Sequence, residues 1–521
     1  VIYLPSKLIV LNYKINLMKI LSATQIKEID TATLINESIS SIDLMERAAQ
    51  ACLFKILKHA DEENDFTILC GKGNNGGDGL AIARMLTERG KNASVLILEY
   101  TKNESTEFKY NLELLSKQNK AKTVHINSLD EFKQIDLSKS IVIDAILGIG
   151  ANKAVEGLLK DIIEDLNSKN HFVIAIDIPS GMFPDEMNEK NTIVRANITL
   201  TFQVPKYNFV FPENIAKTGE LDILDIGLDS KEIQNTTTKN YFSDKAIIKE
   251  LLLTRSLFSH KGNFGHALLI CGSKGMMGST QIAARACLRS GAGLLSVKVP
   301  GCGLNVIQTS LPEAMAISDD ENDFITSLPD ISKYNAIGIG CGIGTDKQTQ
   351  NVLKLLIQNS PIPLLIDADA LNILADNKTW FSFLPKYSIL TPHPKEFDRL
   401  VGAHSNTYQR LNSAKEFAQK YKVIVVLKGI FTACIMPDGN VFFNSTGNPG
   451  LAKGGSGDTL SGIITGLLAR GYAPNHAAIL GVYVHGFAAD LCLVKNHIES
   501  LLASDVIEKL PKAFSKIYNY H

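Results

Sequence analysis

Apolar residues recur along the chain with two different spacings, and stretches of the two kinds alternate. Between residues 24 and 57 they stand three or four positions apart, which predicts helices. After residue 57, short apolar runs alternate with stretches of helical spacing. The runs predict strands over 66–70, 94–98, 141–146, 172–178, 198–203 and 221–226, and the stretches between predict helices over 79–89 and 104–117. This alternation is typical of a parallel sheet wrapped by helices, an α/β fold.

A polar stretch without apolar spacing, residues 228–241, interrupts the alternation and predicts a domain boundary. A second α/β series follows, with strands expected over 266–271, 294–299, 336–339, 363–366, 387–390 and 423–427, a helix over 280–290 and a hairpin turn at 437–440. A chain of 521 residues is too long for one core. We therefore expect two domains, 18–235 and 240–521. Residues 1–17 are expected to be an extension with no part in the fold, because Met18 is the more natural start.

Three polar clusters follow predicted strands of the first half. They are 71–79 (GKGNNGGDG), Asp144 with 147–153, and 177–181 (DIPSG). Ligands of open parallel sheets bind beyond such strand ends. The first cluster matches neither GxGxxG nor GxxxxGK[ST], which disfavours a dinucleotide fingerprint or a P-loop. Oxygens of Asn75, Asp144 and Ser180 suit a hard cation, although the same residues could simply shape turns.

In the second half, residues 448–466 (NPGLAKGGSGDTLSGIITG) combine a glycine-rich turn, an acid and a helical apolar pattern. The pattern predicts a helix that starts at Asp458, with backbone N–H groups of the preceding glycines able to bind a phosphate. Asp458 could then take the proton of a hydroxyl that attacks a phosphoryl group. The alternative is that Asp458 only caps the helix.

His393 follows a predicted strand and stands between two prolines that restrict the backbone. Histidines on apolar helix faces are more often core residues, but this one lies in a strand-end loop. Its position favours a functional role.

Composition narrows the classes of partner. A net charge of −1 and a pI near 6.9 give no basic field for nucleic acid or for anionic lipid, which favours a small-molecule partner. The apolar runs are too short for a membrane span. The eight cysteines form no CxxC pair and lie mostly in apolar segments, so we interpret them as buried thiols of a cytoplasmic protein.

Several of these motifs together resemble two known families. TPHPKEF (391–397), VLKGIFT (426–432) and KGGSGDTLSGIIT (453–465) resemble the ribokinase-like NAD(P)H-hydrate dehydratases. GNNGGDGL (73–80), DAILGIG (144–150) and DIPSG (177–181) resemble the NAD(P)H-hydrate epimerases. The order of motifs is that of the fused bifunctional repair family. The resemblance implies a Rossmann-like doubly wound N-terminal domain and a ribokinase-like α/β/α C-terminal domain.

The same resemblance implies two reactions on nicotinamide cofactors that are damaged by addition of water at C6. The first domain would interconvert the R and S hydrates of NADH and NADPH. The second would dehydrate the S form with ADP, or with ATP in other branches, giving AMP and phosphate when ADP is used. Potassium in the first domain, Mg²⁺ with the nucleotide and a homo-oligomer are further expectations.

Residue roles are carried over from the matching motif positions. In the first domain, Asp177 would be catalytic, potassium would bind Asn75, Asp144 and Ser180, and the hydrate would contact Asn74, Asn75, Gly76, Gly77, Asp78, Gly148, Ile149, Gly150, Ala151, Asn152, Lys153, Ala154 and Asp177. In the second domain, Asp458 would be catalytic, the hydrate would contact Gly293, Gly342, His393 and Asp458, and the nucleotide would contact Lys428, Gly429, Ile430, Phe431, Thr432 and Gly457. Two positions depart from the family pattern: Lys72 stands where proline is common, and Asn197 where aspartate is frequent.

Two other functions fit part of the chain. A small-alcohol kinase would use the same glycine-rich helix start, because that superfold serves many substrates, but it leaves the N-terminal clusters unexplained. Alternatively, the N-terminal domain could be a non-catalytic binding module. The presence of Asn75, Asp144, Asp177 and Ser180 argues against that reading.

Overall fold

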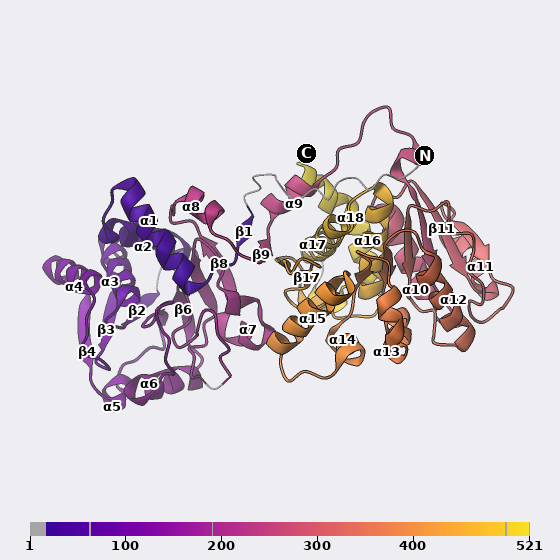
Figure 1. The fold of residues 1–521 in the computed structure, drawn as a ribbon. Coiled ribbons are helices and arrows are strands. Elements are labelled where there is room, and N and C mark those ends of the chain that lie inside the picture. Colours follow the sequence, from indigo (N-terminus) through magenta and orange to yellow (C-terminus); the bar gives the residue numbers. More distant parts are fainter. Residues whose placement is uncertain (1–16, 62–63, 190, 495–496, 520–521) are drawn as a thin grey trace. The chain divides into compact units, whose positions relative to one another are not determined.

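A computed structural model describes residues 17–61, 64–189, 191–494 and 497–519 of the chain. The predicted extension therefore lies almost wholly outside the described residues. The chain changes from one compact unit to the other between Thr238 and Lys239, and Met18 belongs to the second unit. Each unit contains its own sheet (Figure 1). No helix in the described ranges combines the length and the apolar character that crossing a bilayer requires.

The first unit is built on a seven-stranded parallel sheet of order β4-β3-β2-β5-β6-β7-β8. Its strands are β2 (Asp65–Cys70), β3 (Ala93–Leu98), β4 (Lys122–Ile126), β5 (Ser140–Ala145), β6 (Phe172–Ile176), β7 (Ile198–Phe202) and β8 (Glu220–Leu224). The chain winds outward from β2 to β4 and then returns to β5 on the other side. The topological switch point therefore lies between β2 and β5, where ligands of such sheets bind.

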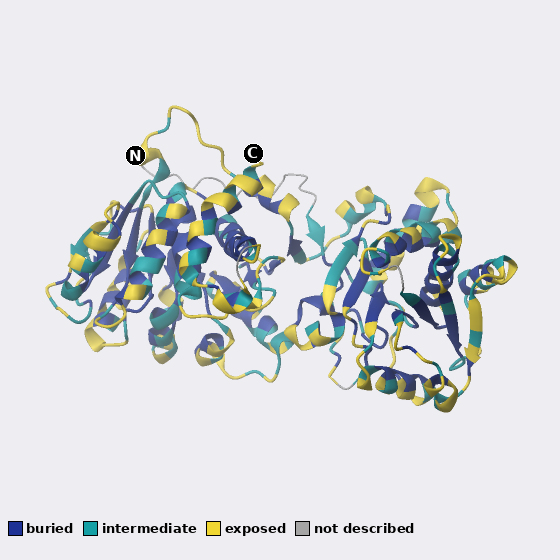
Figure 2. Cartoon of the chain, turned by 180° about the vertical axis from the view of Figure 1, so that it is seen from behind, coloured by how far each residue is buried: buried dark blue, intermediate teal, exposed yellow. Residues whose placement is uncertain are grey.

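Helices cover both faces of this sheet, as a doubly wound fold requires. They are α1 (Ala23–Glu37), α2 (Ser41–Ile56), α3 (Asn74–Glu88), α4 (Thr106–Gln118), α5 (Leu129–Lys133), α6 (Gly157–Ser168), α7 (Pro212–Thr218) and α8 (Ser230–Asn235). Helices α1 to α4 contribute to the apolar core on one face, and α5 and α6 to the core on the other. Figure 2 shows their buried sides turned toward the strands.

One detail of the sequence prediction is wrong in this unit. Helix α3 begins at Asn74 and not at residue 79, because the glycines serve close packing within the helix start. A Cβ at Gly76 would lie 1.8 Å from the carbonyl oxygen of Gly71, and one at Gly79 would lie 2.6 Å from the Cβ of Ala145. Within the polar boundary segment, Ser230–Asn235 forms α8, capped by Asp229 and without a buried residue.

The second unit is built on an eleven-stranded sheet of order β1-β9-β18-β17-β16-β15-β14-β13-β10-β11-β12. The strands are β1 (Met18–Lys19), β9 (Asn240–Ser243), β10 (His266–Ile270), β11 (Leu294–Val299), β12 (Met315–Ser318), β13 (Ala336–Ile339), β14 (Leu364–Ile366), β15 (Ile389–Leu390), β16 (Ile424–Leu427), β17 (Ala433–Ile435) and β18 (Val441–Asn444). The run from β12 to β16 is parallel, and β17 is antiparallel to both neighbours. The predicted hairpin at 437–440 is confirmed.

The helices of this unit are α9 (Lys245–Leu251), α10 (Met277–Arg289), α11 (Leu304–Ser310), α12 (Lys347–Asn359), α13 (Ala368–Asp376), α14 (Pro394–Val401), α15 (Thr407–Tyr421), α16 (Ser456–Arg470), α17 (Pro474–Cys492) and α18 (Ala503–Tyr518). Helix α16 packs against both α10 and α17, and its residues from Thr459 to Ala469 are all buried. Gly462 and Gly466 allow the close approach, since a Cβ at either would lie within 2.4 Å of an α10 carbonyl oxygen. The parallel sheet of the first unit and the mainly parallel sheet of the second confirm the α/β prediction.

Candidate active sites

The three polar clusters of the first unit meet at one edge of its sheet. Cys70 pairs with Ala145 at the ends of β2 and β5, and Asp144 pairs with Ala175 of β6. The segments that follow these strands therefore leave the sheet side by side, at and next to the switch point. Helix α3 starts there with Gly73 at its cap position and no side chain bound to its first N–H groups. Those groups are available to an anion.

The three predicted cation ligands gather around one loop residue, Leu147. The Ser180 side chain donates to Asp144 Oδ1 at 2.5 Å, and its backbone N–H donates to Oδ2 at 2.8 Å. Ser180 Oγ also accepts from the Leu147 N–H at 2.8 Å, while Asn75 Nδ2 donates to the Leu147 carbonyl at 3.0 Å. Asp144 is fully buried, which raises its pKa to about 6, and the hydrogen bonds from Ser180 act in the opposite direction.

The chemistry of this set fits a singly charged cation. One carboxylate, one hydroxyl, one backbone carbonyl and one amide side chain converge, and a half-turn of the Asn75 amide would add its oxygen. Transition metals prefer nitrogen and sulfur ligands, and among the described residues no group of three or more His, Cys, Asp or Glu side chains is arranged so that it could hold a metal ion. The potassium assignment itself stays a prediction.

Asp177 is held by a buried lysine that the sequence analysis missed. Asp177 adopts a left-handed backbone conformation, φ +65°, directly after β6. Its Oδ1 lies 2.6 Å from Lys206 Nζ and accepts the Phe202 N–H at 3.1 Å. The Lys206 side chain is 1% exposed and also donates to the Phe202 carbonyl. The available signal was a lone lysine in the apolar stretch 198–211, since such a residue is rarely buried without an anionic partner.

Two further acids surround this pair. Burial and the charge of Asp177 raise the pKa of Asp30, on α1, to about 6. Burial also raises the pKa of Asp78, on α3, and the charges of Asp177 and Asp30 add to the effect. The site thus combines an ion-paired carboxylate with acids that retain protons more readily, the arrangement expected of an acid and a base. Asp30 was missed, although it stands four residues after Ile26, a buried residue of the same helix.

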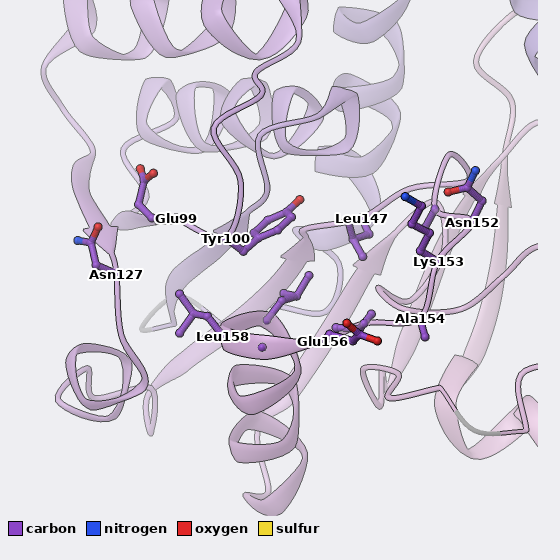
Figure 3. Close-up of a pocket in the computed structure, with 13 residues that line it drawn as sticks. Glu99, Tyr100, Asn127, Leu147, Asn152, Lys153, Ala154, Glu156 and Leu158 are labelled. Carbon is purple, nitrogen blue, oxygen red and sulfur yellow. The ribbon is translucent and has the colours of Figure 1, made fainter.

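A cavity of about 670 Å³ opens beside this edge (Figure 3). Residues 151–154 of the predicted hydrate-binding loop line it, together with Glu99, Tyr100 and Asn127 from the ends of β3 and β4. Gly148, Ile149 and Gly150 do not line it, and neither do Asn74 to Asp78. Leu147 lines the cavity and its backbone bonds Asn75 and Ser180, so the cavity and the candidate cation site are neighbours.

In the second unit, α16 starts at Ser456 and not at Asp458 as the sequence predicted. Gly455 occupies the cap position with φ +88°, a conformation that glycine adopts without strain, and this fixes the earlier start. Asp458 is therefore a first-turn residue and not the capping residue. Burial and the charge of Asp367 raise its pKa, while hydrogen bonds with Cys341 and Ser279 oppose the rise.

Lys428 joins two carboxylates next to this helix start. Its Nζ lies 3.1 Å from Asp367 Oδ1 and 3.7 Å from Glu396 Oε2. Burial alone would lower the pKa of Lys428, but the two carboxylates outweigh it and the pKa is raised. A Cβ at Gly457 would lie 3.5 Å from Lys428 Nζ, so two of the predicted nucleotide contacts are neighbours. Glu396 belongs to the TPHPKEF motif and Asp367 directly follows the predicted strand 363–366, but neither had a predicted role.

Asp367 and Glu396 offer oxygens of the kind that Mg²⁺ prefers. Asp367 Oδ2 accepts the Ser461 hydroxyl at 2.6 Å, which orients the carboxylate. Magnesium sites commonly combine one or two carboxylates with phosphate oxygens and water. The pair therefore fits a magnesium ion that arrives with a nucleotide.

His393 has a structural task at its predicted site. It is the cap of α14, where its Nδ1 accepts the N–H groups of Lys395 and Glu396 at 3.1 and 3.2 Å. Its Nε2 lies 3.4 Å from Glu396 Oε1, which links the imidazole to the Lys428 cluster. Burial lowers the pKa of His393, with the Lys428 charge among the further causes. A contact with the hydrate stays a prediction.

The remaining predicted residues divide into those near the cluster and one apart from it. Ser279 lies 3.3 Å from the position of a Cβ at Gly342 and also hydrogen-bonds Asp458, so Gly342 belongs to this site. Residues 429–432 form the turn after β16, closed by Thr432 Oγ1, which donates to the Gly429 carbonyl at 2.9 Å. Gly293, in contrast, precedes β11, whereas the cluster follows the strands. It lies at the opposite edge of the parallel sheet, about 20 Å away for a strand of six residues.

Two sequence families match the chain. The family described as NAD(P)H-hydrate dehydratase matches residues 267–512, and the one described as YjeF-related protein N-terminus matches residues 41–207. The bifunctional NAD(P)H-hydrate repair enzyme Nnr of Moorella thermoacetica is 34% identical over 512 residues, which are 95% of this chain and 96% of the relative. Its Escherichia coli counterpart is 31% identical over 473 residues, 90% and 89% of the two chains.

Among solved structures, an ADP/ATP-dependent NAD(P)H-hydrate dehydratase from Bacillus subtilis, co-crystallised with ATP and Mg²⁺, is 33% identical to this chain. It covers 53% of this chain and 98% of its own, with a TM-score of 0.47. The curated relatives are therefore similar to both units of the chain.

Proposed function

The chain belongs to the family of bifunctional NAD(P)H-hydrate repair enzymes, and we propose that its two units divide the two reactions between them at the sites described above. The enzyme epimerises the R and S hydrates of NADH and NADPH and dehydrates the S form at the expense of a nucleotide. One observation carries the division of labour. Each sheet has its own cluster of ionisable side chains at the carboxyl ends of its strands, around Asp177 in one and Asp458 in the other.

Epimerisation requires one bond at C6 to break and form again, and the hydroxyl stands on the carbon next to the ring nitrogen. Asp177, ion-paired with Lys206, is the base that takes the hydroxyl proton. The C6–O bond becomes a carbonyl as the C6–N bond opens, and the nitrogen takes a proton from Asp78, whose pKa is raised. Rotation about the adjacent bond and closure by the reverse steps give the other epimer.

Potassium would be held by Asn75, Asp144 and Ser180 with the Leu147 carbonyl. When bound, it supplies a fixed positive charge that orients an oxygen of the hydrate. The chain's own residues would position the rest: the N–H groups at the α3 N-terminus would bind the phosphates, and residues 151–154, which line the cavity, would contact the hydrate.

Dehydration begins when Asp458 takes the proton of the C6 hydroxyl as that oxygen attacks the terminal phosphoryl group of the nucleotide. The N–H groups of residues 455–457 face the negative charge that develops, and Lys428 lies next to them. The phosphate then leaves C6, pushed by the ring nitrogen, and loss of a proton from C5 restores the dihydronicotinamide. Mg²⁺ held by Asp367 and Glu396 would neutralise phosphate charge. ADP is the donor that we propose, with residues 428–432 around it.

Recovery of NADH from hydrates tests this function. Purified protein is given a mixture of both NADH hydrates, ADP, Mg²⁺ and K⁺, and the absorbance of NADH is followed while AMP and phosphate are quantified. The proposal requires the whole mixture to be recovered, with one AMP and one phosphate per NADH. A small-alcohol kinase would leave a stable phosphorylated product, and a chain with a non-catalytic first unit would recover only the S form. The cytoplasmic location and the homo-oligomer stay predictions.

A further inference from the structure

The cavity beside the switch point is lined by residues 151–154 of the predicted hydrate-binding loop and also by polar and aromatic residues from other segments. Its volume of about 670 Å³ lies within the range of small-molecule sites, about 300–1,000 Å³. Figure 3 shows Glu99 and Asn127 on one side, Asn152 and Lys153 on the other, and Tyr100 between them. Its walls thus come from the ends of β3 and β4 as well as from the loop after β5.

Tyr100 supplies a fixed aromatic surface in the middle of this cavity. Its pKa is raised by burial, while a hydrogen bond from the Lys72 backbone opposes the rise, so the hydroxyl is engaged. Gly71 stands so close that a Cβ there would lie 2.9 Å from the Tyr100 oxygen. A ring held in this way can stack on a flat heterocycle without loss of side-chain freedom.

Glu99 is an ionised carboxylate at the end of β3. Lys72 Nζ lies 2.5 Å from its Oε2, and His125 Nδ1 lies 2.7 Å from its Oε1. Burial alone would raise the pKa of Glu99, but these two hydrogen bonds outweigh it and lower the pKa. A carboxylate has about four acceptor positions, so Glu99 can still accept hydroxyl groups. Lys72, the departure from the family pattern, thus helps to hold Glu99 in place.

The position of Glu99 corresponds to a known device of dinucleotide sites. The strand next to the phosphate-binding turn commonly ends in an acid that accepts the ribose 2′-hydroxyl, and a 2′-phosphate is accommodated by an arginine instead. Among the described residues that line this cavity, the charged ones are Glu99, Glu156 and Lys153. This described lining contains no arginine, and the Lys72 ammonium beside it is already paired with Glu99, so no free guanidinium is present there to accommodate a 2′-phosphate.

We propose that this cavity holds the adenosine half of the hydrate, with adenine against Tyr100 and the ribose 2′-hydroxyl on Glu99, so that the epimerase unit prefers NADH hydrate to NADPH hydrate. The inference rests on the proposed epimerase function of the first unit. Leu147 lines the cavity, and its backbone hydrogen-bonds Asn75 and Ser180 at the candidate cation site. A ligand that spans the cavity and this site can place its nicotinamide end near Asp177.

Kinetics without nucleotide test the preference, because the dehydratase cannot then turn over. Interconversion of R and S hydrates of NADH and of NADPH is followed by chromatography for the full chain, for Glu99→Gln and for the control Glu113→Gln, an exposed acid of α4 paired with Lys117. The proposal predicts a higher kcat/KM for NADH hydrate, and a ratio that shifts toward NADPH hydrate by about tenfold in Glu99→Gln only. An unchanged ratio in Glu99→Gln would overturn it.

A second measurement separates this proposal from the epimerase assignment. Hydrogen exchange is compared with and without NADH hydrate, and the segment 151–159 is expected to gain protection when the hydrate binds. Asn127 is exposed and lines the cavity, so the larger side chain of Asn127→Trp should fill part of the cavity and remove this protection. Protection without epimerisation would contradict the epimerase function while supporting the subsite. Epimerisation without protection of that segment would overturn the subsite.

Discussion

Lys206 Nζ lies 2.6 Å from Asp177 Oδ1, and the lysine side chain is 1% exposed. A buried ammonium and a carboxylate in contact stabilise each other, and either alone is costly to bury. Lys206 donates hydrogen bonds to Asp177 and to the Phe202 and Val204 carbonyls, and of these three only Asp177 is assigned to the hydrate. We therefore expect it to act through that residue, as a positioning residue.

Lys206→Met should lower the epimerase kcat by about 10² or more and destabilise the first unit by about 3–5 kcal/mol. The double variant with Asp177→Asn should recover most of that stability but no activity. Trp380, the only tryptophan, lies in the second unit, so its fluorescence monitors that unit separately. A Lys206→Met protein with full epimerase activity would contradict this role.

Asp30 should make the first unit less stable as the pH rises. Its folded pKa of about 6 is raised above the usual value of an aspartate, so the folded state binds its proton more tightly than the unfolded state. Stability is then present below pH 4 and is lost as the pH rises from about 4 to 6. Asp30→Asn should be more stable than the parent at pH 7 by about 3 kcal/mol and nearly equal to it at pH 4. Circular dichroism, compared with Trp380 fluorescence, measures the difference.

Asp144→Ala should abolish epimerisation and its dependence on potassium, because it removes the single carboxylate of the candidate cation site. The dehydratase, which belongs to the other unit, should keep its rate. Thr67→Ala, a change on the same sheet away from the strand ends, provides the matched control. Potassium-dependent epimerisation by Asp144→Ala would show that the cation binds elsewhere.

Each of the two units should keep its own activity when it is expressed without the other. Residues 19–238 form the first compact unit, 239–521 form the second without its N-terminal segment at Met18, and each piece contains a complete cluster. Expressed separately, the first piece should epimerise hydrates and the second should dehydrate the S form. Two folded but inactive pieces would mean that each site needs the other unit.

The sequence predicted the parts of this structure that depend on local spacing. The alternation of apolar runs and helical stretches predicted both sheets. Because ligands of such sheets bind beyond the strand ends, the sequence also predicted that Asn75, Asp144 and Ser180 lie close together. Lys206 and Asp30 were missed because both interact with Asp177, which is 29 positions from Lys206 and 147 positions from Asp30. The spacing of apolar residues along the chain cannot predict an interaction over such a separation. The glycines of 71–79 predicted a loop, since composition does not distinguish turn glycines from those that permit helix packing.

Asp458→Asn separates catalysis from structure in the second unit. The variant keeps the size of the side chain but loses the base, and the cap of α16 is Gly455, so the helix should be unaffected. Dehydration should slow by at least about 10²-fold, with nucleotide affinity and melting temperature nearly unchanged. An active or an unfolded variant would assign Asp458 a structural role only.

Pure R NADH hydrate shows whether one chain performs both reactions. The full chain receives this single epimer with ADP, Mg²⁺ and K⁺, and the absorbance of NADH is followed to completion. Complete recovery is predicted, with no recovery by Asp177→Asn, which should still convert the S epimer at the parent rate. Failure of the parent chain to recover NADH from the R epimer, or equal recovery by Asp177→Asn, would contradict the account.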